Sequence, residues 1–135
     1  MLKSARVLVG GMIVTVGIWA LLSCATVATL PVVECTGTVT VRVLVDTIPT
    51  FSWVPTCTIA RLIVEEGVEE RWGTETLGPS TYESPIVYGV HPPGAFEMDP
   101  PQPLFLGHTY TVSVWRFFSV SPESLQLLGS ANFTP

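Results

Sequence analysis

The sequence is poor in charge, and most of the charge it has is negative. Only 13% of the 135 residues are charged, whereas 47% are hydrophobic. From Val7 onward the basic residues are Arg42, Arg61, Arg71 and Arg116, set against 11 acidic residues. Such a surface repels phosphate backbones, so we expect no nucleic-acid binding. The high apolar content excludes a disordered acidic or basic tail protein.

The sequence also lacks the motifs of common catalytic and metal sites. It contains no G-x-S-x-G, no Gly-rich phosphate loop, no H-E-x-x-H and no C-x-x-C. The two histidines, His91 and His108, have no cysteine or dense acidic cluster at ligand spacing, so they predict no zinc site. We therefore expect a protein that is not an enzyme, with no metal, no cofactor and no small-molecule substrate.

The N-terminal segment is long, apolar and free of charge between residues 7 and 33. Pro31 is the natural end of a helix there, because proline lacks an N–H and disfavours helix at the preceding residue. A helix from Val7 to Leu30 would be about 36 Å long, which is enough to cross a hydrocarbon core of about 30 Å. The sequence therefore predicts one transmembrane helix, with residues 1–34 as a signal anchor.

The basic residues at the start of the chain set the orientation of this helix. Lys3 and Arg6 are expected to stay in the cytoplasm, which leaves the C-terminal domain, residues 35–135, outside it. This predicts a single-pass protein of the bacterial cytoplasmic (inner) membrane, with its N-terminus inside and its C-terminal domain periplasmic, in contact with membrane lipid.

Two other fates of the N-terminal segment stay open. The run Leu21-Leu22-Ser23-Cys24 resembles a bacterial lipoprotein signal, in which Cys24 would become the lipidated first residue of the mature chain. In that signal a small residue is usual where Leu22 stands, and the apolar run continues past Cys24. Cleavage near Ala28 by an ordinary signal peptidase is the third alternative.

Glycines mark one face of the predicted helix. Gly10 and Gly17 are seven residues apart, so they share a face that a neighbouring helix can approach closely. The segment contains no histidine, which excludes imidazole ligation of a haem or chlorophyll-type metal. The helix is predicted to act as an anchor or as a contact to another helix.

The three cysteines leave one pair in the exported domain. If Cys24 is lipidated or lies in the bilayer, Cys35 and Cys57 remain in an oxidising compartment. Two unpaired thiols are the alternative to a bridge between them. A Cys35–Cys57 disulfide would stabilise the domain by about 3 kcal/mol through loop closure.

The exported domain reads as a series of short strands. Residues 38–46 alternate strictly, with valines on one face, which is typical of a half-buried strand. Similar runs cover residues 49–54, 59–66, 71–77, 84–90, 109–118 and 127–133. About seven strands with no amphipathic helix predict an all-β fold, an antiparallel sandwich. The Pro-rich segment 92–103 is expected to be a long loop.

The domain resembles the fibronectin type III family over residues 39–134. Phe51-Ser52-Trp53 is similar to the second strand of that family, whose tryptophan packs in the core. Leu104, Gly107 and Tyr110 match the L-x-P-G-T-x-Y signature at its Leu, Gly and Tyr; Leu106 and His108 replace its Pro and Thr. The resemblance implies a fibronectin-III-like sandwich with a tyrosine corner at Tyr110, and a binding or spacing module without catalytic residues.

Aromatic residues supply the candidate contact surface. If Tyr110 points inward, alternation sends Trp115 and Phe117 to the opposite face of the strand. They either pack under another segment or form a patch for a partner, which Trp72 would join. Phe96 and Met98 lie in the middle of the Pro-rich loop, where stiffness lowers the entropic cost of docking.

These features predict a non-enzymatic, membrane-anchored accessory or structural subunit that docks on a larger integral membrane protein complex. Its layout is similar to that of the small single-helix subunits of respiratory or photosynthetic complexes. The alternative is a free-standing bacterial envelope lipoprotein that binds a protein, peptide or glycan.

Overall fold

A computed structural model describes residues 33–118 and 124–135, and this part of the chain is all β. It has eight strands rather than about seven: β1 Thr40–Leu44, β2 Thr50–Val54, β3 Arg61–Glu66, β4 Glu69–Thr76, β5 Ile86–Val87, β6 Ala95–Asp99, β7 Tyr110–Phe117 and β8 Leu125–Phe133. The predicted helix lies outside the described residues, together with Gly10, Gly17 and Cys24. Within the described ranges, no helix is long and apolar enough to cross a membrane.

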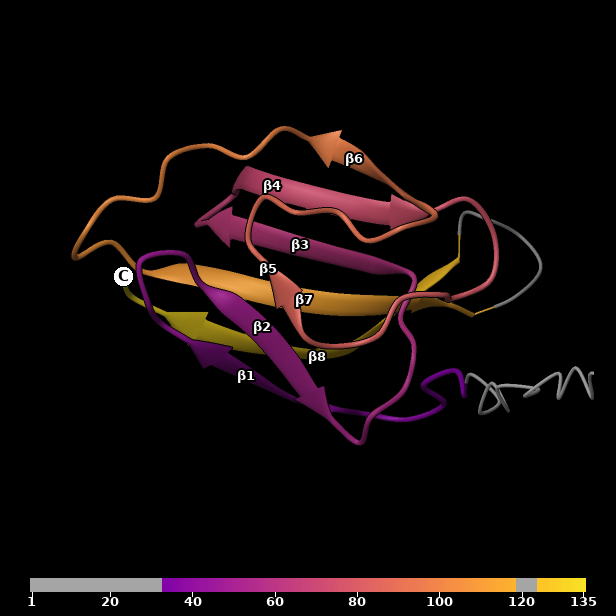
Figure 1. Ribbon diagram of the computed structural model, residues 1–135. Helices are drawn as coiled ribbons and strands as arrows, with labels where there is room; N and C mark the ends of the chain where they lie inside the picture. Colours follow the sequence, from indigo (N-terminus) through magenta and orange to yellow (C-terminus); the bar gives the residue numbers. More distant parts are fainter. Residues whose placement is uncertain (1–32, 119–123) are drawn as a thin grey trace, which may run out of the picture.

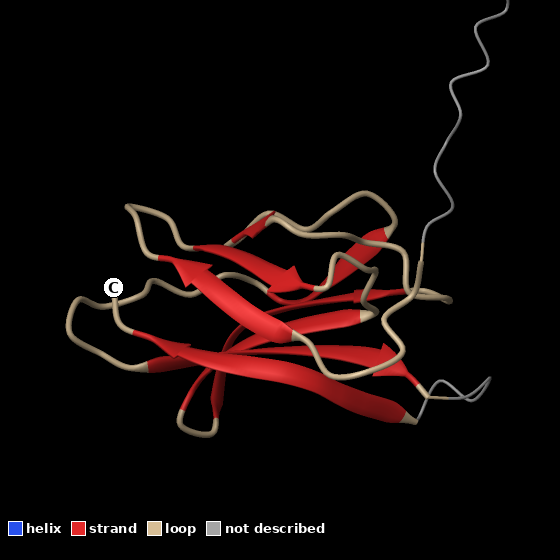
Figure 2. Ribbon diagram, turned by 90° about the horizontal axis from the view of Figure 1, so that it is seen from below, coloured by secondary structure: helices blue, strands red, loops and turns tan. Residues whose placement is uncertain are grey.

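The strands form two antiparallel sheets that pack face to face (Figures 1 and 2). The smaller sheet has the order β1-β2-β5, and the larger has the order β6-β4-β3-β7-β8. Strand β3 occupies the centre of the larger sheet and pairs with β7 over five residues, from Arg61 opposite Trp115 to Glu65 opposite Thr111. The described chain is therefore a two-layer sandwich.

The core lies between the sheets and is filled by the inward faces of the alternating strands. Phe51 and Trp53 of β2, Leu62 of β3, and Val112 and Val114 of β7 are buried. The Trp53 indole Nε1 donates a hydrogen bond to the Cys57 carbonyl oxygen at 2.8 Å, so its polar atom is satisfied inside the core.

The first residue of β7 ties the sandwich to the preceding loop. Tyr110 is fully buried, and its phenol oxygen accepts a hydrogen bond from the Phe105 backbone N–H at 2.8 Å. This is the geometry of a tyrosine corner, in which a buried tyrosine bonds the backbone a few residues upstream.

Strand β6 corrects the expectation of a loop over residues 92–103. Ala95–Asp99 pairs with β4 at the edge of the larger sheet, between Pro92-Pro93 and Pro100-Pro101. Proline is compatible with this arrangement because an edge strand uses only one side of its backbone, and here the prolines flank the strand. The connection is thus partly strand, and its residues 96 and 98 belong to the sheet.

The two ends of the sandwich are distinct. The described chain begins at Val33 at one end, here called the entry end, and the C-terminus lies at the other, the far end (Figure 1). The β2–β3 connection is at the entry end, whereas the β1–β2 turn and residues 100–109 are at the far end.

Candidate functional site

The face of the larger sheet that points away from the core carries four of the five residues predicted to contact a partner. Strand pairing aligns residues across all five strands in one line: Phe96 lies opposite Glu75, Glu75 opposite Arg61, Arg61 opposite Trp115, and Trp115 opposite Leu127. Residues paired in this way point to the same side of a sheet. We call this face the outer face and these five residues the cross-sheet row.

Trp115 is bonded to a buried neighbour on the outer face. Its indole Nε1 donates a hydrogen bond to the Ser113 hydroxyl at 3.1 Å, and Ser113 is buried although it points away from the core. Trp115 itself is half-buried. The indole therefore has a satisfied N–H and still exposes part of its ring.

Other apolar side chains extend the row. Phe117 is two residues beyond Trp115, pairs with Leu125, and is half-buried. Met98 stands beside Gly73, where an added Cβ would lie 3.5 Å from the Met98 Cβ. Phe96 is 38% exposed and Leu127 45%. These residues leave a partly exposed apolar surface toward the entry end of the outer face.

An ion pair stands in the middle of the row. The Arg61 guanidinium contacts the Glu75 carboxylate, and the two side chains are 23% and 15% exposed. Because the pair is nearly covered by its neighbours, its charges are only weakly screened by solvent. Alternation within Arg61–Glu66 is the signal that places Arg61 outward, but its neighbours cannot be identified without the strand register.

Trp72 corrects the sequence interpretation, which places it in the contact patch. It is fully buried, and it pairs with Val64 on the inward side of the sheet. Its indole Nε1 donates to the Glu97 carboxylate at 3.2 Å, and its ring packs edge-on against Tyr88 with centroids 5.3 Å apart. Trp72 alternates with Thr74 and Thr76, which are also buried, so it lies on the inward face of β4. Trp72 is inaccessible to a partner.

Acidic residues occupy the far half of the outer face. Glu65 and Glu70 are paired across β3 and β4, and Asp99 of β6 lies opposite Gly73. Glu70 Oε1 is buried without a hydrogen-bond partner above Gly73. Burial, reinforced by the Asp99 carboxyl, raises the pKa of Glu70. The outer face thus divides into an apolar half and an acidic half.

A second polar cluster lies near the tyrosine corner at the far end. His108 Nδ1 is 2.6 Å from Glu66 Oε1, and Arg71 Nη2 is 2.7 Å from Glu66 Oε2. The hydrogen bond with His108 lowers the pKa of Glu66, and Arg71 acts in the same direction. The Glu66 carboxylate therefore joins Arg71 and His108 in one surface network.

The far end also holds an open groove of about 500 Å³. Its lining is mainly apolar and includes Ile48, Tyr88, Pro101, Pro103 and Leu106. The Tyr88 hydroxyl is 2.7 Å from the Gln102 carbonyl oxygen, and burial raises the pKa of Tyr88 to about 12. A phenol that stays protonated and is already hydrogen-bonded offers no acid–base chemistry at neutral pH.

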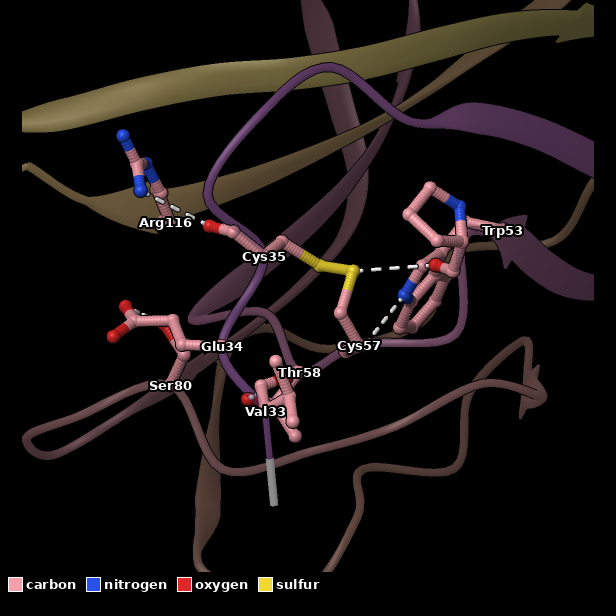
Figure 3. Close-up of a disulfide and its surroundings, with 9 residues drawn as sticks. Val33, Glu34, Cys35, Trp53, Cys57, Thr58, Ser80 and Arg116 are labelled. Carbon is pink, nitrogen blue, oxygen red and sulfur yellow. Dashed lines mark hydrogen bonds between the residues drawn. A yellow bond between two sulfur atoms is a disulfide. The ribbon is translucent and has the colours of Figure 1, made fainter. Parts of the chain in front are cut away.

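The entry end is closed by a disulfide between Cys35 and Cys57, the pair that parity of the cysteines predicts (Figure 3). The Cys35 N–H donates to the Thr58 carbonyl oxygen at 3.0 Å, and the Thr58 N–H donates to the Val33 carbonyl oxygen at 2.8 Å. Arg116 Nη1 donates to the Cys35 carbonyl oxygen at 3.1 Å. The chain is therefore fixed to both sheets as soon as it enters the domain.

In residues 33–118 and 124–135, no group of three or more His, Cys, Asp or Glu side chains could hold a metal ion. Comparisons of the chain with protein-family models, with curated proteins and with solved structures find no match. The outer face, where the predicted contact residues gather, is the candidate site.

Proposed function

We propose that this chain is a non-enzymatic docking subunit of a membrane protein assembly. In this proposal residues 1–34 form the signal anchor in the cytoplasmic membrane, and the periplasmic sandwich presents its outer face to an integral membrane protein complex. The site is a protein-contact surface that requires no cofactor.

Two features support a fibronectin-III-like identity for the sandwich. Trp53 is buried on the second strand, and Tyr110 opens the strand before the last with its hydroxyl bonded to the Phe105 backbone. Domains of this family are mostly binding or spacing modules, which agrees with a docking role.

The observation that carries the proposal is the convergence of apolar side chains from separate strands on one exposed sheet face. Phe96 and Trp115 come from strands at positions far apart in the sheet, yet the register places them in one row. Large aromatics beside an arginine are the residue types that dominate binding free energy at protein interfaces. A tryptophan and a phenylalanine held on a rigid sheet lose little conformational entropy on docking.

Purification of the full chain from its native membrane in mild detergent tests the proposal. We expect Trp115→Ala and Phe96→Ala each to weaken co-purification of the assembly, at a cost of about 2 kcal/mol or more for a central residue. Phe105→Ala is the matched control, because Phe105 is 53% exposed at the far end and only its backbone bonds Tyr110.

Retention of the assembly by both face variants would refute docking through the outer face. A thermal midpoint lowered by many degrees in Trp115→Ala, with association intact, would make Trp115 a structural residue. In that case the Phe96→Ala variant decides whether the outer face is the docking surface, because Phe96 lies on an edge strand.

The lipoprotein alternative is a second candidate because Leu21, Ser23 and Cys24 fit a lipoprotein signal. In that case the same sandwich would be held to the membrane by lipid on Cys24 and would bind a protein, peptide or glycan. The intact mass of the native protein distinguishes the two: a chain beginning at a diacylated Cys24 identifies the lipoprotein, and retention of residues 1–23 identifies the anchor.

A further inference from the structure

The residue types of the cross-sheet row are complementary to the same row read in the opposite direction. From β6 to β7 it runs aromatic, acid, base, aromatic: Phe96, Glu75, Arg61, Trp115. Read backwards, the row places a base opposite each acid and an aromatic opposite each aromatic. We infer that the partner of the outer face is a second copy of this chain, an inference that rests on the proposed function because it takes the same face as the docking surface.

The symmetry of such a pair follows from the register. Two sheets that meet face to face are related by a two-fold axis lying in the plane between them. If the axis runs parallel to the strands, between β3 and β4, each residue meets the one at the mirrored position in the row. Arg61 then faces Glu75 of the second copy, and Trp115 faces its Phe96. An axis along the row would instead oppose Arg61 to Arg61.

The central ion pair becomes a closed network in this arrangement. Within one chain Arg61 contacts Glu75 on one side, and both side chains keep some exposed surface. In the pair, two arginines and two glutamates alternate, so every charge has two opposite neighbours as it loses water. Charge complementarity of this kind fixes the orientation of an interface more than its strength.

The acidic half of the face limits the contact. Glu65 is four residues along β3 from Arg61, about 13 Å away at the rise of an extended strand. A two-fold axis parallel to the strands keeps each residue at its own level, so Glu65 of one copy faces Glu70 of the other, and repulsion between these like charges holds the two sheets apart there. The contact is therefore confined to the apolar half, toward the entry end.

The size of the contact suits chains held in one membrane. Four strands overlap across this axis, and four strands about 4.8 Å apart by about 13 Å of strand give roughly 250 Å² on each side, or about 500 Å² in all. Stable complexes in solution bury about 1,200 Å² or more. Confinement raises the effective concentration toward the millimolar range, where a contact of this size is populated.

Charge exchange between two copies tests the inference in the full chain reconstituted in lipid vesicles. Donor- and acceptor-labelled chains are mixed, and self-association is measured by energy transfer against protein-to-lipid ratio. We expect Arg61→Glu and Glu75→Arg each to weaken association by about tenfold or more, because each homotypic pair sets like charges opposite one another. Mixing the two variants should restore association to within about threefold of the natural chain, since each glutamate of the first variant then meets an arginine of the second.

Controls separate this result from damage to the fold and from other contacts. Arg42→Glu and Glu83→Arg change exposed charges away from the outer face and should leave association unchanged. The double variant R61E/E75R restores the pair within a chain and across the two-fold, so it should associate like the natural chain.

Energy transfer that is unaffected by either single variant places self-association elsewhere and overturns the inference. So does a mixture that fails to recover. Absence of self-association in the natural chain, with co-purification still lost in Trp115→Ala, also overturns it and leaves the proposed docking on a different protein intact. Retained co-purification in the Trp115 and Phe96 variants removes the proposed function itself.

Discussion

Removal of the Cys35–Cys57 disulfide gives the sharpest test of how the entry end stabilises the domain. The perturbation is the double variant Cys35→Ala/Cys57→Ala. Alanine is a small apolar replacement that suits these two buried positions, which are 2% and 5% exposed. The bridge joins residues 22 apart in sequence. Closing a loop of that length in the unfolded chain stabilises the native state by about 3 kcal/mol in the chain-entropy model.

That loss is a large part of the stability of a domain of this size. For a domain of 60–100 residues each kcal/mol shifts the thermal midpoint by about 4–8 °C, so the variant should melt about 12–25 °C lower. The backbone hydrogen bonds between the entry segment and Thr58 can still form in the folded variant. In its unfolded state, however, no covalent bond holds these two segments close together.

The measurement is thermal and denaturant unfolding of the full chain in detergent, followed by circular dichroism, with and without reductant. Cys24→Ala is the matched control, because it removes a cysteine outside the pair and should leave the midpoint unchanged. A loss below about 1 kcal/mol, against the loop-closure value above, would refute the reasoning. Complete alkylation of Cys35 and Cys57 in unreduced, denatured protein would refute it as well.

Two further predictions concern single side chains. Tyr110→Phe removes the acceptor of the Phe105 N–H and should lower the free energy of unfolding by about 1–2 kcal/mol, measured in urea; an unchanged value would show that water replaces the phenol. Glu70 has a raised pKa in the folded state, so the natural chain loses stability as pH rises through that pKa. Glu70→Gln should therefore be more stable than the natural chain at pH 7, and the difference should shrink as Glu70 becomes protonated at acid pH; unfolding curves at pH 4 and pH 7 that show a constant difference would contradict this.

The sequence predicts the fold well where a short pattern or a count of residues is sufficient evidence. The alternation of Val39, Val41 and Val43 is enough to identify the first strand, and parity of the cysteines is enough to select their pairing. The first signal is a local pattern, and the second follows from the number of cysteines. They require no knowledge of which strands are adjacent.

The candidate site can be predicted only in part, because it depends on register. Alternation sets Trp115 and Phe117 on the side opposite Tyr110, but it cannot show that Phe96 shares their face, since β6 is hidden between prolines. Alternation puts Trp72 on the same side of its strand as Thr74 and Thr76, but it cannot show that this side faces the core. The pair of Arg61 and Glu75 escapes sequence reasoning because neither residue is unusual until the two strands are paired.

The entry-end disulfide also determines how the domain carries mechanical load. A pull applied at Val33 passes through the Cys35–Cys57 bond into the β2–β3 connection, so β1 and β2 lie in a covalently closed loop outside the line of tension. The 22-residue separation corresponds to about 75 Å of extended chain that stretching cannot release while the bond is intact. Tension applied at Val33 therefore falls first on the larger sheet, and the β1–β2 hairpin is shielded from it.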